Sequence, residues 1–131
     1  MGAVMTPVSV GELADKITIL EIKAERLDDA DKLAHVRTEL DALLAPWRGV
    51  EAGDPGFAAL KAELKAVNAT MWDIQDGLRE RERRQTFDDE FIRLARAVAT
   101  TNHARVELKN AINRLAGAGF IEEKQYAADA D

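Results

Sequence analysis

The chain has 131 residues, of which 47% are hydrophobic and 32% charged, and its formal net charge is −6. This length suits one domain with its own core, and the absence of cysteine excludes disulfides and thiolate chemistry. The acidic balance argues against nucleic-acid and anionic-membrane partners, and no apolar run approaches the roughly 20 residues of a membrane-spanning helix. Since the first ten residues do not resemble a secretory signal, we expect a cytoplasmic protein.

The first predicted helix spans about residues 10–27. Ser9, followed three residues later by Glu12, forms a capping box at its start. The apolar residues of its main seam recur at steps of four and three, and they are Leu13, Ile17, Leu20, Ala24 and Leu27. Ile19 and Ile22 fall outside this seam, and an exposed apolar face there is typical of a helical oligomerisation module.

The second predicted helix spans about residues 30–45. Asp28 or Asp29 is its N-cap. Pro46 ends it, because the residue before a proline avoids the helical region. The loop that follows begins with Trp47, which we expect to cover one end of the bundle.

The third predicted helix spans about residues 56–84. Asp54 caps it and Pro55 occupies its first turn, where the missing amide hydrogen costs nothing. Its apolar seam is unbroken and consists of Phe57, Leu60, Leu64, Val67, Met71, Ile74 and Leu78.

The fourth predicted helix spans about residues 87–116. Thr86 and Asp89 form a second capping box, and Gly117 is the expected C-terminal stop. In the short tail beyond it, Phe120, Ile121 and Tyr126 could pack back on the helices, and the last residues are expected to fray.

Two short helices followed by two long ones, with tight connections, predict an all-α protein. The expected architecture is an antiparallel four-helix bundle: two short helices, then a long helical hairpin, with a short C-terminal tail. If the hairpin turns at Gln85, residues whose numbers sum to about 172 lie at the same height, because both helices rise about 1.5 Å per residue.

Polar residues interrupt the seam of the fourth helix halfway along its length. After Phe87, Phe91, Leu94 and Val98, the next two seam positions are Thr101 and Arg105, and Asn102, Lys109 and Asn113 lie beside the gap. A matching polar stripe on the third helix consists of Asn68, Trp72, Gln75, Arg79 and Glu82. The predicted register places Asn68 and Trp72 opposite Thr101, Asn102 and Arg105.

A guanidinium group at a seam position must be paired, solvated or directed into a pocket. The available partners of Arg105 are Glu12, Asp15, Glu21 and Asp76. Three interpretations stay open: a ligand pocket or partner-binding groove, a polar layer that fixes helix register, and an arginine that reaches water along its stem. A pocket predicts that Arg105→Leu stays folded, whereas a structural layer predicts that it unfolds.

Other candidate signals are weaker. His35 precedes Glu39 by four residues and His103 precedes Glu107 likewise, but the Glu-x-x-His pattern of di-metal bundles is absent, so we predict exposed pairs and no metal site. The arginine-rich run at residues 79–84 contains interleaved glutamates and suits a solvated helix end. No phosphate-binding loop, dinucleotide fingerprint or serine elbow occurs, and no cofactor is expected.

Several specific blocks, spread over nearly the whole chain, belong to one known pattern: SVGELADKITILEIK at 9–23, Asn68, WDIQD at 72–76, Arg79, FIRLAR at 91–96, Thr101-Asn102, Arg105, Leu108-Lys109, Ile112-Asn113 and EEKQY at 122–126. In these blocks the chain resembles an uncharacterised bacterial family of short helical proteins, domain-of-unknown-function family 6165. The chain departs from the family pattern at Gln75, Ala99, His103 and Gln125, so no role that needs a carboxylate at 75 or 103 is carried over from the family.

The resemblance implies a companion of the glycosyltransferases that build cell-surface polysaccharide, with no established activity. The recurring polar residues of the family map onto Asn68, Trp72, Arg79, Asn102, Arg105, Lys109 and Lys124. The leading hypothesis is therefore a non-catalytic accessory or binding module with a glycosyltransferase or other protein partner.

Two alternatives remain. The first is an enzyme or receptor for an anionic small molecule, such as a phosphorylated or nucleotide-linked sugar. In it Arg105, Lys109 and Arg79 hold the anion, Asn68 and Asn102 bind hydroxyls, and Trp72 stacks on the ligand. The second is a homo-oligomerisation module built on the first helix.

Overall fold

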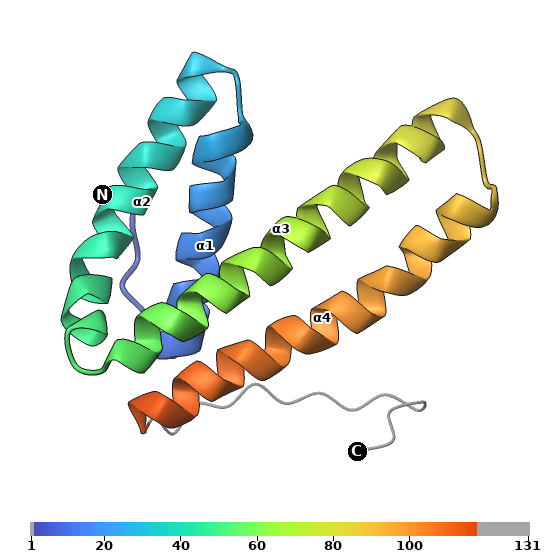
Figure 1. Cartoon of the computed structure of the whole chain (residues 1–131). Helices are drawn as coiled ribbons and strands as arrows, with labels where there is room; N and C mark the ends of the chain where they lie inside the picture. The colour runs from blue at the N-terminus through green and yellow to red at the C-terminus, as the bar shows by residue number, and fades with distance from the viewer. Residues whose placement is uncertain (1, 118–131) are drawn as a thin grey trace.

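The computed structural model describes residues 2–117, and it confirms the all-α fold class (Figure 1). Four helices account for most of this part of the chain: α1 (Val10–Arg26), α2 (Ala30–Glu51), α3 (Pro55–Arg84) and α4 (Asp89–Ala116). No strand occurs within residues 2–117. The expectations for the tail, including Phe120, Ile121, Tyr126 and Lys124, lie outside the described residues.

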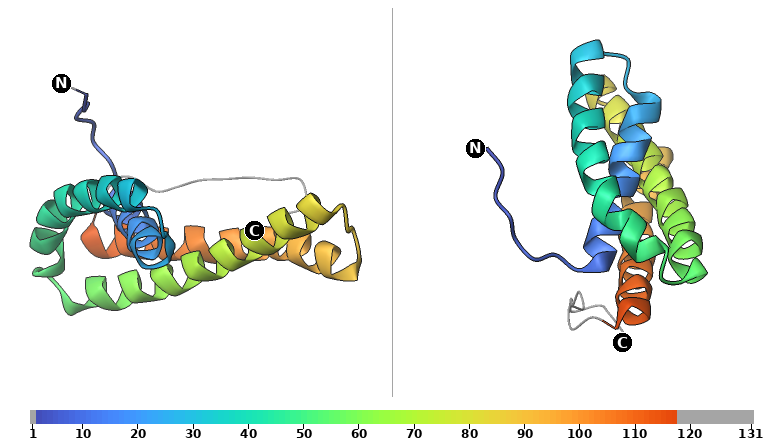
Figure 2. Two further views of the ribbon diagram at one scale, coloured as in Figure 1. Left: turned by 90° about the horizontal axis from the view of Figure 1, so that it is seen from above. Right: turned by 90° about the vertical axis from the view of Figure 1, so that its left-hand side faces the viewer.

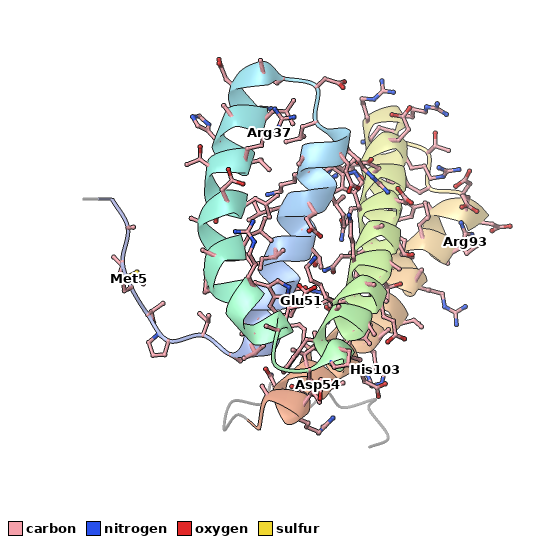
Figure 3. The ribbon with its side chains drawn as sticks, turned by 60° about the vertical axis from the view of Figure 1, so that its left-hand side comes forward. Met5, Arg37, Glu51, Asp54, Arg93 and His103 are labelled. Carbon is pink, nitrogen blue, oxygen red and sulfur yellow. The ribbon has the colours of Figure 1, made fainter. Side chains whose placement is uncertain are left out.

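The helices form two antiparallel hairpins of unequal length. The α1–α2 hairpin stands across one half of the α3–α4 hairpin, whose other half projects beyond it (Figures 1 and 2). Helix α1 packs against all three other helices. Helix α2 packs mainly against α1 and makes a smaller contact with α3. The segment that precedes α1 and carries Met5 leads away from the helices (Figure 3). We call the projecting half of the long hairpin the arm; it runs from about Gly77 through the turn to about Leu94.

The main apolar core lies where all four helices meet. Its buried members are Ala14, Ile17, Trp47, Phe57, Leu64 and Ile112. Each helix contributes at least one of them; Ile17, Phe57 and Leu64 belong to the predicted seams, whereas Trp47, the contribution of α2, lies outside them. The core therefore holds α1 against one half of the long hairpin, and this places the polar residues of α1 beside those of α3 and α4.

Most predicted helix ends are confirmed. The Ser9 hydroxyl accepts the amide hydrogen of Glu12 at 3.0 Å, and the Asp29 carboxylate accepts that of Lys32 at 2.9 Å. Asp54 caps α3, with Pro55 in its first turn. Gly117 ends α4 in the left-handed conformation that glycine tolerates best.

The predicted end of α2 at residue 45 is wrong, since the helix continues through Pro46 to Glu51. A proline inside a helix costs roughly 3 kcal/mol. Burial of Trp47, which is 1% exposed and packs edge-on against Phe57, offsets this cost. The Trp47 indole also donates to Glu51 Oε2 at 2.7 Å, so Trp47 belongs to the core and not to a loop.

The predicted start of α4 is also wrong, by two residues. The N-cap is Asp88, whose carboxylate accepts the amide hydrogen of Phe91 at 2.9 Å and also the Nε hydrogen of Arg81 at 3.2 Å. The Thr86 hydroxyl instead donates to the carbonyl of Arg84. The second contact of Asp88 ties the helix start to α3, which explains why it replaces Thr86. Phe87 is left 53% exposed.

The predicted register of the long hairpin is confirmed at two heights. A Cβ atom added to Gly56 would lie 2.9 Å from Leu115, and one added to Gly77 would lie 2.8 Å from Leu94. Both pairs match the predicted register to within one residue. The turn lies at Gln85, which adopts a left-handed conformation (φ 56°) and ends α3.

Candidate functional site

The centre of the candidate site is an ion pair between Asp15 on α1 and Arg105 on α4. Two parallel contacts join them: Nε to Oδ1 at 2.9 Å and Nη2 to Oδ2 at 2.6 Å. The Asp15 side chain is 3% exposed and that of Arg105 is 29% exposed. The guanidinium Nη1 also donates to the amide oxygen of Asn102 at 3.2 Å. Of the four carboxylates that the sequence offered as partners, the structure selects Asp15.

Asn68 on α3 completes this arrangement from the third side. Its amide nitrogen donates to Asp15 Oδ1 at 3.0 Å and to the Thr18 hydroxyl at 2.9 Å. The Thr18 hydroxyl in turn donates to the carbonyl of Asp15 at 2.8 Å. Three helices therefore meet at one carboxylate, which fixes their heights relative to one another.

The environment of Asp15 keeps it ionised. Burial by itself would raise the pKa of the Asp15 carboxyl, because the charged form loses water. Hydrogen bonds from Arg105 and Asn68, together with the charges of Arg105 and Lys109, outweigh burial and hold this pKa below its ordinary value. Asp15 is therefore a permanent carboxylate at neutral pH, and a poor acceptor of a catalytic proton.

A second ion pair lies nearer the start of α1. Lys109 Nζ lies 2.8 Å from Glu12 Oε2, and the Lys109 side chain is only 6% exposed. Beside it, the amide of Gly11 donates to Asn113 Oδ1 at 2.7 Å. A Cβ atom on Gly11 would lie 2.3 Å from the carbonyl oxygen of Lys109, so the two backbones approach as closely as only glycine allows.

A pocket of about 240 Å³ opens next to the Asp15–Arg105 pair. Side chains from α1, α3 and α4 form its wall, namely Ile19, Ile22, Asn68, Met71, Trp72, Gln75, Arg79 and Arg105. Trp72 is backed by Arg26, whose guanidinium carbon lies 5.9 Å from the centre of the indole ring. The wall is mainly apolar, and its polar members are two amides and two arginines.

The structure brings together four of the six predicted site residues. Asn68, Trp72, Arg79 and Arg105 line the pocket. Asn102 and Lys109 are not among the residues that line it. Asn102 supports Arg105, and Lys109 is buried against Glu12. These two residues serve the network behind the pocket.

Other pocket residues escaped the prediction because their roles depend on how α1 docks. Ile22 is 2% exposed and Ile19 half-buried, so the apolar face that was expected to be exposed is instead a wall of the pocket. Met71 belongs to the predicted seam and Gln75 to the polar stripe, yet both face the pocket. Thr18 gave no sequence signal at all.

Apart from Arg79, which lines the pocket, the weaker signals lie away from this site. His103 pairs with Glu107 at 3.0 Å on an exposed face of α4, as predicted. The arginines near the end of α3 pair with neighbouring carboxylates, for example Arg83 with Glu80. Within residues 2–117 no group of three potential metal ligands gathers, and no helix in that range is long and apolar enough to cross a membrane.

Comparison with known proteins identifies one relationship. The sequence pattern of a family described as "Family of unknown function (DUF6165)" matches residues 4–130, which is nearly the whole chain. No curated protein and no solved structure matches the chain.

Proposed function

This chain belongs to the DUF6165 family of unknown function, and we propose that it is a non-catalytic binding module whose pocket receives part of a partner protein. The observation that carries the proposal is the mainly apolar pocket between α1, α3 and α4, with Trp72 in its wall. The side chains that anchor one protein on another commonly occupy small apolar pockets of this kind.

The charges around the pocket favour this function over the binding of an anionic sugar. Of the three cations predicted to hold a phosphate, Arg105 and Lys109 are already paired with Asp15 and Glu12, which leaves only the exposed Arg79 in an easily exchanged pair. Breaking either pair would leave a carboxylate without its partner, and for the buried Asp15 this is costly. The free energy needed to break the pair would therefore be subtracted from the affinity for a phosphate.

The size of the pocket also argues against a nucleotide-linked sugar as the ligand. Its volume of about 240 Å³ lies below the roughly 300–1,000 Å³ of sites that enclose drug-sized ligands. A nucleotide-linked sugar exceeds this space, whereas one large side chain fits it. An anchoring side chain is therefore the better match.

The resemblance of the sequence to a family that accompanies glycosyltransferases supplies the first class of partner to test. In this proposal the module binds such an enzyme and assists it in the synthesis of cell-surface polysaccharide. The proposal places the protein with its partner in the cytoplasm.

Co-purification tests this function with one informative variant and one matched control. The full chain is tagged and co-expressed with the products of its neighbouring genes, beginning with any glycosyltransferase among them. Trp72→Ala removes the aromatic wall of the pocket, and Phe87→Ala removes an aromatic side chain that is 53% exposed on the arm. We expect the partner to be retained by the wild type and by Phe87→Ala, and to be reduced at least about tenfold, or 1.4 kcal/mol, by Trp72→Ala.

Circular dichroism verifies that both variants fold. Absence of a partner, or equal retention by a folded Trp72→Ala variant, would contradict the proposal.

A further inference from the structure

We infer that the pocket is the seat for a single tyrosine side chain of the partner protein, an assignment that rests on the proposed function. The pocket volume sets the first limit. A cavity of about 150 Å³ holds benzene, and the pocket here measures about 240 Å³. It therefore has room for one six-membered ring with a substituent.

The wall of the pocket suits the flat face and edge of an aromatic ring. Ile19, Ile22 and Met71 supply aliphatic and thioether contacts, and Trp72 supplies an aromatic partner. Sulfur and indole groups both interact favourably with a second ring beyond the effect of buried area. An aliphatic side chain in the pocket would be stabilised only by the burial of its apolar surface, without these interactions with sulfur and indole.

Gln75 distinguishes tyrosine from phenylalanine. Gln75 lines the pocket, and the only hydrogen bond of its side chain among residues 2–117 is donated to the thioether of Met71, also a lining residue, at 3.9 Å. Sulfur is a weak acceptor, so this amide can exchange it for a phenolic hydroxyl. The other amide in the wall, Asn68, already donates to Asp15 and Thr18. Gln75 is thus the group that would bind the hydroxyl.

Arg79 indicates what accompanies the tyrosine. Arg79 lines the pocket, its side chain is 72% exposed, and its one ion pair among residues 2–117 is with Asp76 at 3.2 Å. An exposed pair of this kind contributes little stability and is readily exchanged. A carboxylate close to the tyrosine in the partner could therefore pair with Arg79.

Titration of the full chain with side-chain analogues, followed by NMR, tests the assignment without the partner. The probes are p-cresol for tyrosine and toluene for phenylalanine. We expect p-cresol to bind at least about fivefold more tightly than toluene, with shifts at the Trp72 indole and the Gln75 amide. In Gln75→Leu the two affinities should become equal, and Trp72→Ala should bind neither probe.

Each other result overturns a defined part of the inference. Equal affinities in the wild type would exclude the hydroxyl contact, and no binding of either probe would exclude an aromatic seat. Tyr126 is the one tyrosine of this chain. If full-length Tyr126→Ala binds p-cresol much more tightly than the wild type, the seat belongs to the chain itself and not to a partner. Co-purification remains a separate readout, so these failures are distinguishable from failure of the proposed function.

Discussion

The two halves of the α3–α4 hairpin carry similar polar stripes but use them differently. In the half that α1 covers, Asn68, Lys109 and Asn113 are buried, and each bonds or pairs with a group on α1. In the arm, most arginines are exposed and pair with glutamates three or four residues away, as Arg83 does with Glu80. Arg81 is half-buried and pairs with Asp88 across the turn. Trp72 and Gln75 lie at the boundary, where the pocket opens.

The difference shows that contact with α1, and not the stripe itself, decides what a polar residue does. Where α1 excludes water, each polar group needs a protein partner, so the network specifies one position for α1. Along the arm water serves as the partner, and ion pairs there are weakly stabilising. The pocket lies at this boundary, with Ile19 and Ile22 of α1 on one side and residues of α3 between Asn68 and Arg79 on the other.

Of the variants that distinguish the covered half from the arm, Arg105→Leu should change the free energy of unfolding the most. Asp15 would remain buried without its double contact, which should lower the free energy of unfolding by about 3–5 kcal/mol. Urea denaturation followed by circular dichroism measures this change. If Arg105 only lined a ligand pocket, Arg105→Leu would stay fully stable. Because Arg105 is instead paired with the buried Asp15, we expect this variant to lose stability.

A double variant shows whether the loss comes from the stranded charge. Asp15→Asn combined with Arg105→Leu removes both charges, and its amide can still accept a bond from Asn68. We expect it to be about 2 kcal/mol more stable than Arg105→Leu alone. If Arg105→Leu is instead as stable as the wild type, the apolar core alone holds α1.

A smaller effect is expected from adding one methyl group to a glycine in each half. In Gly11→Ala the new Cβ meets the backbone carbonyl of Lys109 at 2.3 Å, and backbone cannot move without shifting α1. In Gly77→Ala it meets the end of the Leu94 side chain at 2.8 Å, which can rotate away. We expect Gly11→Ala to lose about 2–3 kcal/mol by the same assay.

Gly77→Ala is the control, and it should change by less than about 1 kcal/mol, because alanine also favours the helix. Equal losses at both glycines would mean that α1 and the arm are packed equally tightly.

The sequence predicts the helices and the hairpin register well because both follow from local periodicity and equal helical rise. It fails at Pro46, where burial of Trp47 offsets the local cost of proline. It also offers four carboxylates for Arg105 and cannot choose among them, since the choice depends on how α1 docks. The same docking turns Ile22 from an expected surface residue into a pocket wall. What remains unpredictable is therefore tertiary packing, and Thr18 is its clearest case.

The smallest expected difference between the covered half and the arm is in how their carboxylates make stability depend on pH, and in the covered half it depends on Asp15. Because the folded-state pKa of Asp15 is below its ordinary value of 3.8, the carboxylate form stabilises the fold above that pH. This contribution is lost as the pH falls through 3.8 toward the folded-state pKa. Asp15→Asn should be less stable than the wild type at neutral pH, yet should lose less stability in this acid range.

Hydrogen bonds from arginines also lower the pKa values of carboxylates on the arm, but these pairs are exposed to water and therefore to salt. A hydrogen bond from Arg83 lowers the pKa of Glu80, and one from Arg93 lowers that of Glu90. At about 1 M salt, where charges are screened beyond about 3 Å, the arm's share of the acid sensitivity should shrink. The difference between the wild type and Asp15→Asn should persist, because the buried pair is shielded from ions. If salt abolishes that difference, the Asp15–Arg105 pair is solvated like those of the arm, and α1 is not anchored by it.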